Sequence, residues 1–248
     1  MCFFLHPDTL VREQIAPEIL GREYEVYLFQ DSEAAAAMAV GTPVVAVFVS
    51  LSGDASQEQW GTLATALMPA DGSGATRLGI LASAETPQWA LEPEGLAGGV
   101  ARIDLKASVQ SAVDALLREL EATGERGRRR YVRAHCQPEA VVFTLKDRPE
   151  VTGTVNDISS NGMSCRFADQ GPAPAGNVWF QIELRSGPRK CLVAAQIVSQ
   201  DPRNQRTIAM FGSTLEGKDK LTLRAIVLNA LQEDMARRIE EARSLRKR

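Results

Sequence analysis

The first half of the chain alternates short apolar runs with stretches that carry apolar residues at helical spacing. Residues 44–49 are apolar and mostly β-branched, as expected of a parallel strand that is buried on both faces. Similar runs predict five strands, at residues 2–5, 25–29, 44–49, 76–82 and 99–105. Helices are predicted between and after them, at residues 10–20, 33–40, 56–67 and 108–122. This order predicts an α/β domain with a parallel, doubly wound, flavodoxin-like sheet.

After residue 133 the pattern changes to short runs in which apolar and polar residues alternate. In residues 177–184, one face carries Val178, Phe180, Ile182 and Leu184, which predicts a half-buried strand. Strands are predicted at residues 134–143, 151–158, 162–167, 177–184, 192–198 and 207–211. Turn signals rich in glycine and proline separate them. Six or seven short strands at this spacing predict an all-β domain, a small antiparallel barrel.

The last segment, residues 217–248, is charged and periodic, which predicts a C-terminal helix. Its apolar residues follow a repeat of roughly seven, at Leu221, Leu228, Leu231, Met235, Ala242 and Leu245. Two interpretations stay open at this point. Either the helix packs its apolar side on the barrel, or its distal part pairs with another chain.

These patterns divide the chain into an α/β domain at residues 1–122, an arginine-rich hinge at 123–133, a barrel at 134–216 and a helix at 217–248. Charge follows a similar division. Residues 1–124 carry 6 Lys+Arg and 17 Asp+Glu, a net charge of −11, whereas the remaining residues carry 22 and 14, a net charge of +8. A basic half is typical of proteins that bind an anionic ligand or partner. The acidic half argues against nucleic-acid binding by the whole molecule.

The α/β half resembles the receiver domains of response regulators in the order and length of its elements. The resemblance implies an acidic pair after the first strand, a phosphoaccepting aspartate ending the third, a Ser/Thr after the fourth and a lysine after the fifth. Here the third strand ends at Ser50, Asp8 is single, and Ser83 and Lys106 stand near the last two positions. Serine cannot replace a carboxylate that is phosphorylated and holds Mg²⁺. We therefore expect a receiver-like scaffold that lacks the phosphoacceptor and mediates a protein contact or dimerisation.

Composition, hydropathy and cysteine spacing mainly serve to exclude classes of function. The 248 residues are 44% hydrophobic and 24% charged, as in ordinary soluble proteins. No apolar run nears the roughly 20 residues of a membrane span, and the N-terminus lacks a secretory signal, so we expect a cytoplasmic protein. The cysteines lack metal-ligand spacing; they are Cys2, Cys136, Cys165 and Cys191. Since the sequence offers no nucleophile–base pair either, we expect no metal, no cofactor and no enzymatic activity.

Five arginines lie within the eight residues 126–133. Alone, such a cluster is typical of a solvated linker or a nonspecific anion-binding surface. Within it, Arg129 and Arg133 have the spacing R-x-x-x-R. A second motif, D-x-S-x-x-G, ends a predicted barrel strand and consists of Asp157, Ser159 and Gly162. In isolation this motif is typical of an Asx or Ser turn.

Together, the two motifs and the predicted barrel resemble the PilZ family of bacterial receptors for cyclic diguanylate (c-di-GMP), over residues 126–216. The resemblance implies a PilZ-type β-barrel with a ligand site formed by Arg128, Arg129, Arg133, Asp157, Ser159 and Gly162. Arginine can bind phosphate bidentately, meet the O6/N7 edge of guanine or stack on bases. Arg128 is expected to help hold a second, stacked copy of the ligand.

The remaining residues of the implied site have different roles. When ionised, Asp157 is acceptor-only, so it can take hydrogen bonds from the N1–H and amino group of guanine. Ser159 can donate to a phosphate oxygen or a base, and Gly162 is expected to supply a turn with positive φ. The sequence departs from the family where a glycine is common in late strands, at Ala209 and at Ala194-Ala195. These departures bear on ligand packing and hence on affinity.

The leading hypothesis is a non-enzymatic receptor in which c-di-GMP orders residues 127–133 against the barrel and changes the interdomain arrangement. The expected partners are c-di-GMP, an unidentified downstream protein (for instance in motility) and a second copy of the chain, through the C-terminal helix or the N-terminal domain. Two alternatives stay open. One is a protein-interaction adaptor with a decayed nucleotide site. The other is a DNA-binding regulator that uses the arginine cluster and the basic tail 243–248.

Overall fold

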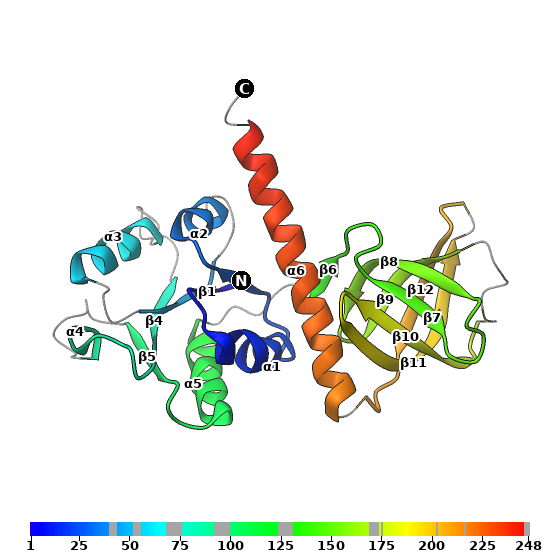
Figure 1. Cartoon of the computed structure of the whole chain (residues 1–248), viewed down its shortest axis with the longest axis horizontal. Coiled ribbons are helices and arrows are strands. Elements are labelled where there is room, and N and C mark those ends of the chain that lie inside the picture. The colour runs from blue at the N-terminus through cyan, green and yellow to red at the C-terminus, as the bar shows by residue number, and fades with distance from the viewer. Residues whose placement is uncertain are drawn as a thin grey trace. The chain divides into compact units, whose positions relative to one another are not determined.

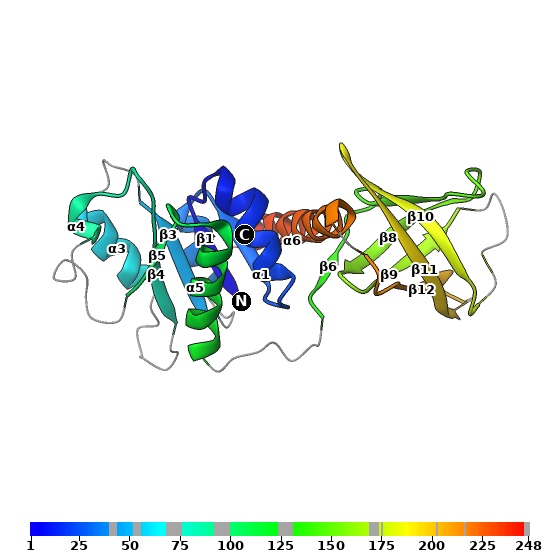
Figure 2. The same ribbon diagram turned by 90° about the horizontal axis from the view of Figure 1, so that it is seen from below.

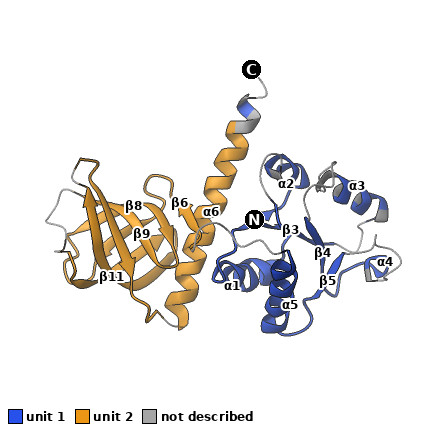
Figure 3. Cartoon of the chain, turned by 180° about the vertical axis from the view of Figure 1, so that it is seen from behind, with its two compact units in different colours: residues 1–128, 242–248 blue, residues 129–241 orange. Residues whose placement is uncertain are grey.

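The chain forms two compact units, each with its own sheet (Figure 3). Unit 1 comprises residues 1–128 and 242–248, and unit 2 comprises residues 129–241. The structure, a computed structural model, describes residues 1–39, 44–51, 56–67, 76–91, 100–123, 131–168, 174, 176–201, 203–215 and 217–245. The domain bounds expected from the sequence stay a prediction.

Unit 1 contains a five-stranded sheet in the order β2-β1-β3-β4-β5, with every neighbouring pair parallel. The strands are β1 (Cys2–Leu5), β2 (Val26–Phe29), β3 (Ala46–Ser50), β4 (Arg77–Ala82) and β5 (Ala101–Asp104). The predicted flavodoxin-like sheet is confirmed. Its central strand, β3, is buried from Ala46 to Val49, because β1 and β4 flank it and helices cover both faces.

The helices of unit 1 lie on both faces of this sheet (Figures 1 and 2). They are η1 (Val11–Ile15), α1 (Ala16–Leu20), α2 (Ser32–Ala39), α3 (Gln57–Leu67), α4 (Gln88–Leu91) and α5 (Val109–Ala122). The helix η1–α1 packs beside α5, and α2 packs beside α3. The single helix expected over residues 10–20 begins with a π-helical turn, and the short α4 was not expected. Ser108, the expected first residue of the last helix, is instead the N-cap of α5, and its side chain accepts a hydrogen bond from the Ser111 amide.

Unit 2 is an antiparallel barrel, as predicted. Its strands are β6 (Arg133–His135), β7 (Val142–Leu145), β8 (Thr152–Ser159), β9 (Gly162–Phe167), β10 (Trp179–Ser186), β11 (Arg189–Asp201) and β12 (Arg206–Phe211). Six of them follow the order β8-β7-β10-β11-β12-β9, and pairing of β9 with β8 closes the barrel (Figure 1). Fully buried side chains fill its core, including those of Phe143, Ile158, Ile182 and Leu184.

One predicted barrel strand is wrong. Residues 134–143 form two strands, β6 and β7, rather than one. Pro138 and Glu139, which has a positive φ of 64°, form a turn that the Ala140 amide closes by donating to the Gln137 carbonyl. This break allows β6 to pair with the second half of β8 while β7 pairs with the first half.

The C-terminal helix α6 (Gly217–Leu245) is confirmed. Its first turn is bonded to β11, because the Asp219 carboxylate accepts from the Leu192 amide and the Asp219 carbonyl accepts from the Cys191 thiol. Leu221, one of the predicted repeat positions, is exposed, whereas Leu228 is buried. Pairing of α6 with another chain stays a prediction. Among the described residues, no helix is both long and apolar enough to cross a membrane.

Candidate ligand-binding site on the barrel

A β-bulge in β8 turns Asp157 away from the barrel core. Val155 pairs with Cys165 of β9 and the next pair is Asp157 with Ser164, so Asn156 is the extra residue. In a regular strand Asp157 would share the core face with Val155, because side chains alternate with a period of two. After the bulge, Ile158 takes the core face, fully buried. Asp157 therefore lies on the outer face, the side of the sheet away from the core.

Strand β6 brings an arginine to the same face. Its register pairs Arg133 with Ser159 and His135 with Asp157. Directly paired residues of antiparallel strands have neighbouring side chains on one face. The Arg133 Nη1 atom lies 3.6 Å from Asp157 Oδ1, longer than a direct hydrogen bond. Arg133, Asp157 and Ser159, which were predicted from two distant motifs, thus lie together on one face.

Ser159 and Gly162 belong to the tight turn that joins β8 to β9. The Ser159 hydroxyl donates to the Gly162 carbonyl at 3.1 Å and accepts from the Asn161 amide at 3.3 Å. The Asn161 carbonyl in turn accepts from the Phe211 amide at 2.9 Å, which fastens this turn to β12. The single hydroxyl hydrogen of Ser159 is thus used within the turn.

Gly162 is needed for a reason other than the one expected from the sequence. Among the described residues, glycines 187 and 217 have positive φ and Gly162 does not, so the predicted positive-φ turn at Gly162 is wrong. Instead, β9 and β12 approach closely here. A Cβ atom on Gly162 would lie 2.5 Å from the Ala209 carbonyl oxygen, closer than real Cβ contacts allow. A side chain at this position would push the two strands apart.

An arginine that the sequence reasoning missed completes the cluster. Arg206, the first residue of β12, donates from Nη2 to Asp157 Oδ2 at 3.0 Å and from Nε to the Ser164 hydroxyl at 2.7 Å. Asp157 is therefore flanked by two guanidinium groups from opposite ends of the barrel sequence. One feature of the sequence could have indicated Arg206. Side chains alternate between the two faces along β12, so burial of Thr207 and Ala209 places Arg206 on the outer face.

A row of paired residues crosses the outer face through this site. It runs over β10, β11, β12, β9, β8 and β6, in the order Trp179, Gln196, Met210, Gly162, Ser159 and Arg133. Trp179 and Met210 are exposed at 54% and 50%. The Ala209 side chain, in contrast, is buried on the core face, paired with Met163 and Ile197. The site therefore has bare backbone at Gly162, with exposed apolar side chains on one side and arginine on the other.

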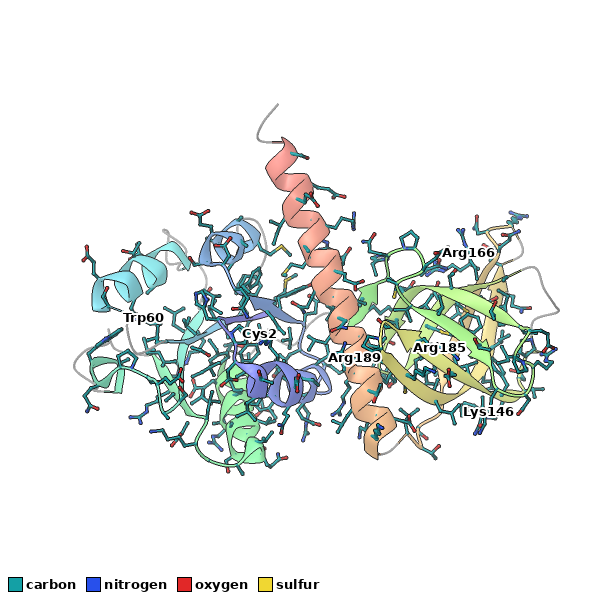
Figure 4. The ribbon with its side chains drawn as sticks, in the orientation of Figure 1. Cys2, Trp60, Lys146, Arg166, Arg185 and Arg189 are labelled. Atoms are coloured by element: carbon teal, nitrogen blue, oxygen red, sulfur yellow. The ribbon has the colours of Figure 1, made fainter. Side chains whose placement is uncertain are left out.

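A second cross-strand row on the outer face is largely basic. It passes over β11, β10, β7, β8 and β9, in the order Lys190, Arg185, Val142, Thr154 and Arg166. Arg166 and Arg185 are labelled in Figure 4. Arg185 is paired with Glu183, which offsets its charge locally. The net positive charge of this row suits an anionic ligand.

The two cysteines near Asp157, Cys136 and Cys165, have raised thiol pKa values and are expected to be unreactive. Burial, with the negative charges of Asp157 and Glu233 as smaller causes, raises the pKa of Cys136 to about 12. Burial, with the Asp157 charge second, likewise raises the pKa of Cys165 to about 12. Both thiols thus stay protonated at neutral pH and are poor nucleophiles. Within the described part of the chain, no group of three or more His, Cys, Asp or Glu residues could hold a metal ion.

Comparison with known proteins identifies this barrel. The family model for the PilZ domain matches residues 127–229. Residues 127–229 are a PilZ domain. Of the six residues that the sequence predicted for its site, the structure brings together Arg133, Asp157, Ser159 and Gly162. The other two, Arg128 and Arg129, lie outside the described residues.

Several solved structures resemble the PilZ part of the chain. The PilZ domain of YcgR from Escherichia coli, with c-di-GMP, is 24% identical with a TM-score of 0.36; the match covers 46% of this chain and 98% of that one. YcgR from Escherichia coli in complex with c-di-GMP is 25% identical with a TM-score of 0.35, covering 48% and 50%. The Bacillus subtilis inhibitor of motility, MotI, is 20% identical with a TM-score of 0.32, covering 42% and 51%.

The chain thus spans about half the length of the YcgR complex and of MotI. A search of curated proteins found no match.

Proposed function

We propose that this chain is a non-enzymatic receptor for c-di-GMP. The observation that carries the proposal is the meeting of Arg133, Asp157 and Gly162 on one outer face of a PilZ domain, although they come from three different strands. The structures of YcgR with c-di-GMP name the ligand for that protein. The charge and donor pattern of the present site supports the same ligand here.

The geometry suggests how each residue would act. The Arg133 side chain is 49% exposed, and its ion pair with Asp157 is long, so a phosphate or guanine can engage its guanidinium with little loss. The ionised Asp157 carboxylate accepts from the N1–H and amino group of guanine. Ser159 holds the turn through Gly162 and Asn161. The absence of a side chain at Gly162 leaves backbone open to the ligand.

Arg128 and Arg129 complete the proposed site as the residues that precede β6. Arg129 would supply the second guanidinium of the R-x-x-x-R motif, and Arg128 would help hold a second ligand copy. Strand β6 is three residues long and pairs with the second half of β8. A ligand bound to both Arg133 and Asp157 would add contacts between β6 and β8. Binding is thereby coupled to ordering of the segment that joins the two units, and so to regulation of a partner protein.

Titration calorimetry of the full chain with c-di-GMP tests the proposed function. Loss of one charged hydrogen-bonding group in a site lowers affinity by about 10- to 100-fold, so we expect this loss in Arg133→Ala, Arg129→Ala and Asp157→Ala. Arg203→Ala is the matched control, because Arg203 is an exposed arginine in the β11–β12 hairpin. A parent chain without measurable affinity refutes the receptor and leaves the ligand-independent adaptor. Salt-dependent DNA binding without nucleotide affinity would instead support the DNA-binding regulator.

Hydrogen exchange and small-angle scattering test the conformational part separately. We expect c-di-GMP to slow amide exchange in β6 and to change the scattering profile of the full chain. Binding without either change would retain the receptor and refute the switch. Analytical ultracentrifugation with and without ligand tests the proposed homodimer through α6 or the N-terminal domain.

A further inference from the structure

Arg206 holds the Asp157 carboxylate in one orientation. Its guanidinium has two anchors, Asp157 Oδ2 at 3.0 Å and the Ser164 hydroxyl at 2.7 Å. Because a guanidinium is planar and rigid, two anchors fix both its position and the carboxylate oxygen that it contacts. The anchors are well buried, with Ser164 exposed at 1% and Asp157 at 8%. The Arg206 side chain itself is 47% exposed, so water competes for its free donors but has little access to the two acceptors.

The β-sheet register explains why this arrangement forms. Asp157 pairs with Ser164 across β8 and β9, and Ser164 pairs with Ile208 across β9 and β12. Arg206 lies two residues before Ile208, so its side chain is on the same outer face. The Arg206 side chain therefore reaches the adjacent Ser164 and Asp157 from the start of β12. The bulge at Asn156 is a condition for this contact, since it puts Asp157 on the outer face.

The contact leaves acceptor capacity on Asp157. An ionised carboxylate has about four lone-pair sites, and the Arg206 contact uses Oδ2. Arg133 lies 3.6 Å from Oδ1, beyond a direct hydrogen bond. Guanine offers two adjacent donors at N1–H and the amino group. Adenine offers one donor beside an acceptor, so a carboxylate oriented by Arg206 would favour guanine.

We infer that Arg206 is a positioning residue that orients Asp157 for guanine and sets the base selectivity of the site. This inference rests on the proposed function. Arg206 acts through Asp157, and Ser164 acts through Arg206 by holding its Nε. Lysine is not equivalent here, because its ammonium donors lack the rigid planar fork by which arginine fixes the orientation of two acceptors.

The test measures affinity for c-di-GMP and for cyclic diadenylate in the parent, Arg206→Ala, Arg206→Lys and Ser164→Ala chains. We expect Arg206→Ala to weaken c-di-GMP binding by about 10- to 100-fold and to lower the ratio of guanine to adenine affinity. Arg206→Lys should recover little of that ratio, and Ser164→Ala should fall between parent and Arg206→Ala. Arg203→Ala again serves as control, being three residues earlier and exposed.

The outcomes separate the inference from the function on which it rests. A parent chain that does not bind c-di-GMP refutes both. If the parent binds, unchanged or tighter binding by Arg206→Ala overturns the inference alone. Equal losses for both dinucleotides also overturn it, because Arg206 would then contribute charge or fold stability without selecting the base. Melting temperatures show which variants are folded. If Arg206→Ala does not fold, the selectivity of Ser164→Ala decides the inference.

Discussion

The close approach of β9 and β12 at Gly162 predicts that one added methyl group has a large effect on stability. In Gly162→Ala the new Cβ would lie 2.5 Å from the Ala209 carbonyl oxygen and 3.3 Å from the Met210 Cα. To reach the 3.4 Å of ordinary contact, Cβ and the carbonyl oxygen must separate by about 0.9 Å. Both contacts are to the β12 backbone, so no flexible side chain can yield. The hydrogen bonds between β9 and β12 would then have to stretch beyond about 3.2 Å, the upper end of normal donor–acceptor distances.

We therefore expect Gly162→Ala to destabilise unit 2 by roughly 1–3 kcal/mol, the usual cost of overpacking. For a domain of about 110 residues this corresponds to a melting temperature lower by roughly 4 °C per kcal/mol. Gly176→Ala is the matched control within the same unit. Its Cβ would find the nearest atom, the Ile197 carbonyl oxygen, only at 4.0 Å. Without strain, its stability should stay within about 0.5 kcal/mol of the parent.

Urea unfolding followed by circular dichroism gives the free energies, and hydrogen exchange of peptides from β9 and β12 assigns the change to the barrel. Exchange should accelerate in those two strands in Gly162→Ala and stay at the parent rate in Gly176→Ala. Equal stabilities for the two variants would refute the close-approach explanation of Gly162. Destabilisation confined to peptides of unit 1 would refute it as well.

Three further predictions concern other parts of the chain. Ser108→Ala removes the N-cap of α5 and should destabilise unit 1 by about 1 kcal/mol in urea unfolding; an unchanged midpoint contradicts the cap. Phe143→Ala empties a fully buried core position and should cost about 3–5 kcal/mol, whereas Val178→Ala, 54% exposed, should cost little. Cys165 has a pKa raised from 9.0 to about 12, so folding retains a proton that the unfolded chain loses above pH 9. Its contribution to stability is present below pH 9 and is lost as the pH rises from 9 towards 12. In urea unfolding, Cys165→Ala should therefore lower the loss of stability over this pH range, to which the other three cysteines still contribute.

The order of the elements could be predicted from the sequence because hydrophobic periodicity encodes it directly. The run around Val47 is apolar at every position, and β3 is indeed the central strand. The break between β6 and β7 was missed, because Glu139 is not a residue type that favours positive φ. Tertiary structure imposes that backbone conformation, and a pattern of apolar residues does not report it.

The candidate site was predictable only in part, for a similar reason. Local motifs identify Arg133 and Asp157, since each has a spacing that can be seen in a short window. Arg206 is 49 residues beyond Asp157, and the two meet only through the register of three strands. The role of Gly162 was also out of reach, because the atom that excludes a side chain is the carbonyl oxygen of Ala209 in another strand.

The extra residue of the bulge in β8, Asn156, connects this strand to the segment that follows β6 through its main chain. Asn156 adds one residue, and its carbonyl accepts the Cys136 amide at 2.9 Å. That bond uses main-chain atoms, so many substitutions at position 156 should be tolerated. Deleting the residue would leave Asp157 directly after Val155, so the alternation along the strand would still put Asp157 on the outer face and Ile158 on the core face. The deletion would instead remove the acceptor of the Cys136 amide, so its cost should fall on the attachment of β6, the strand that carries Arg133.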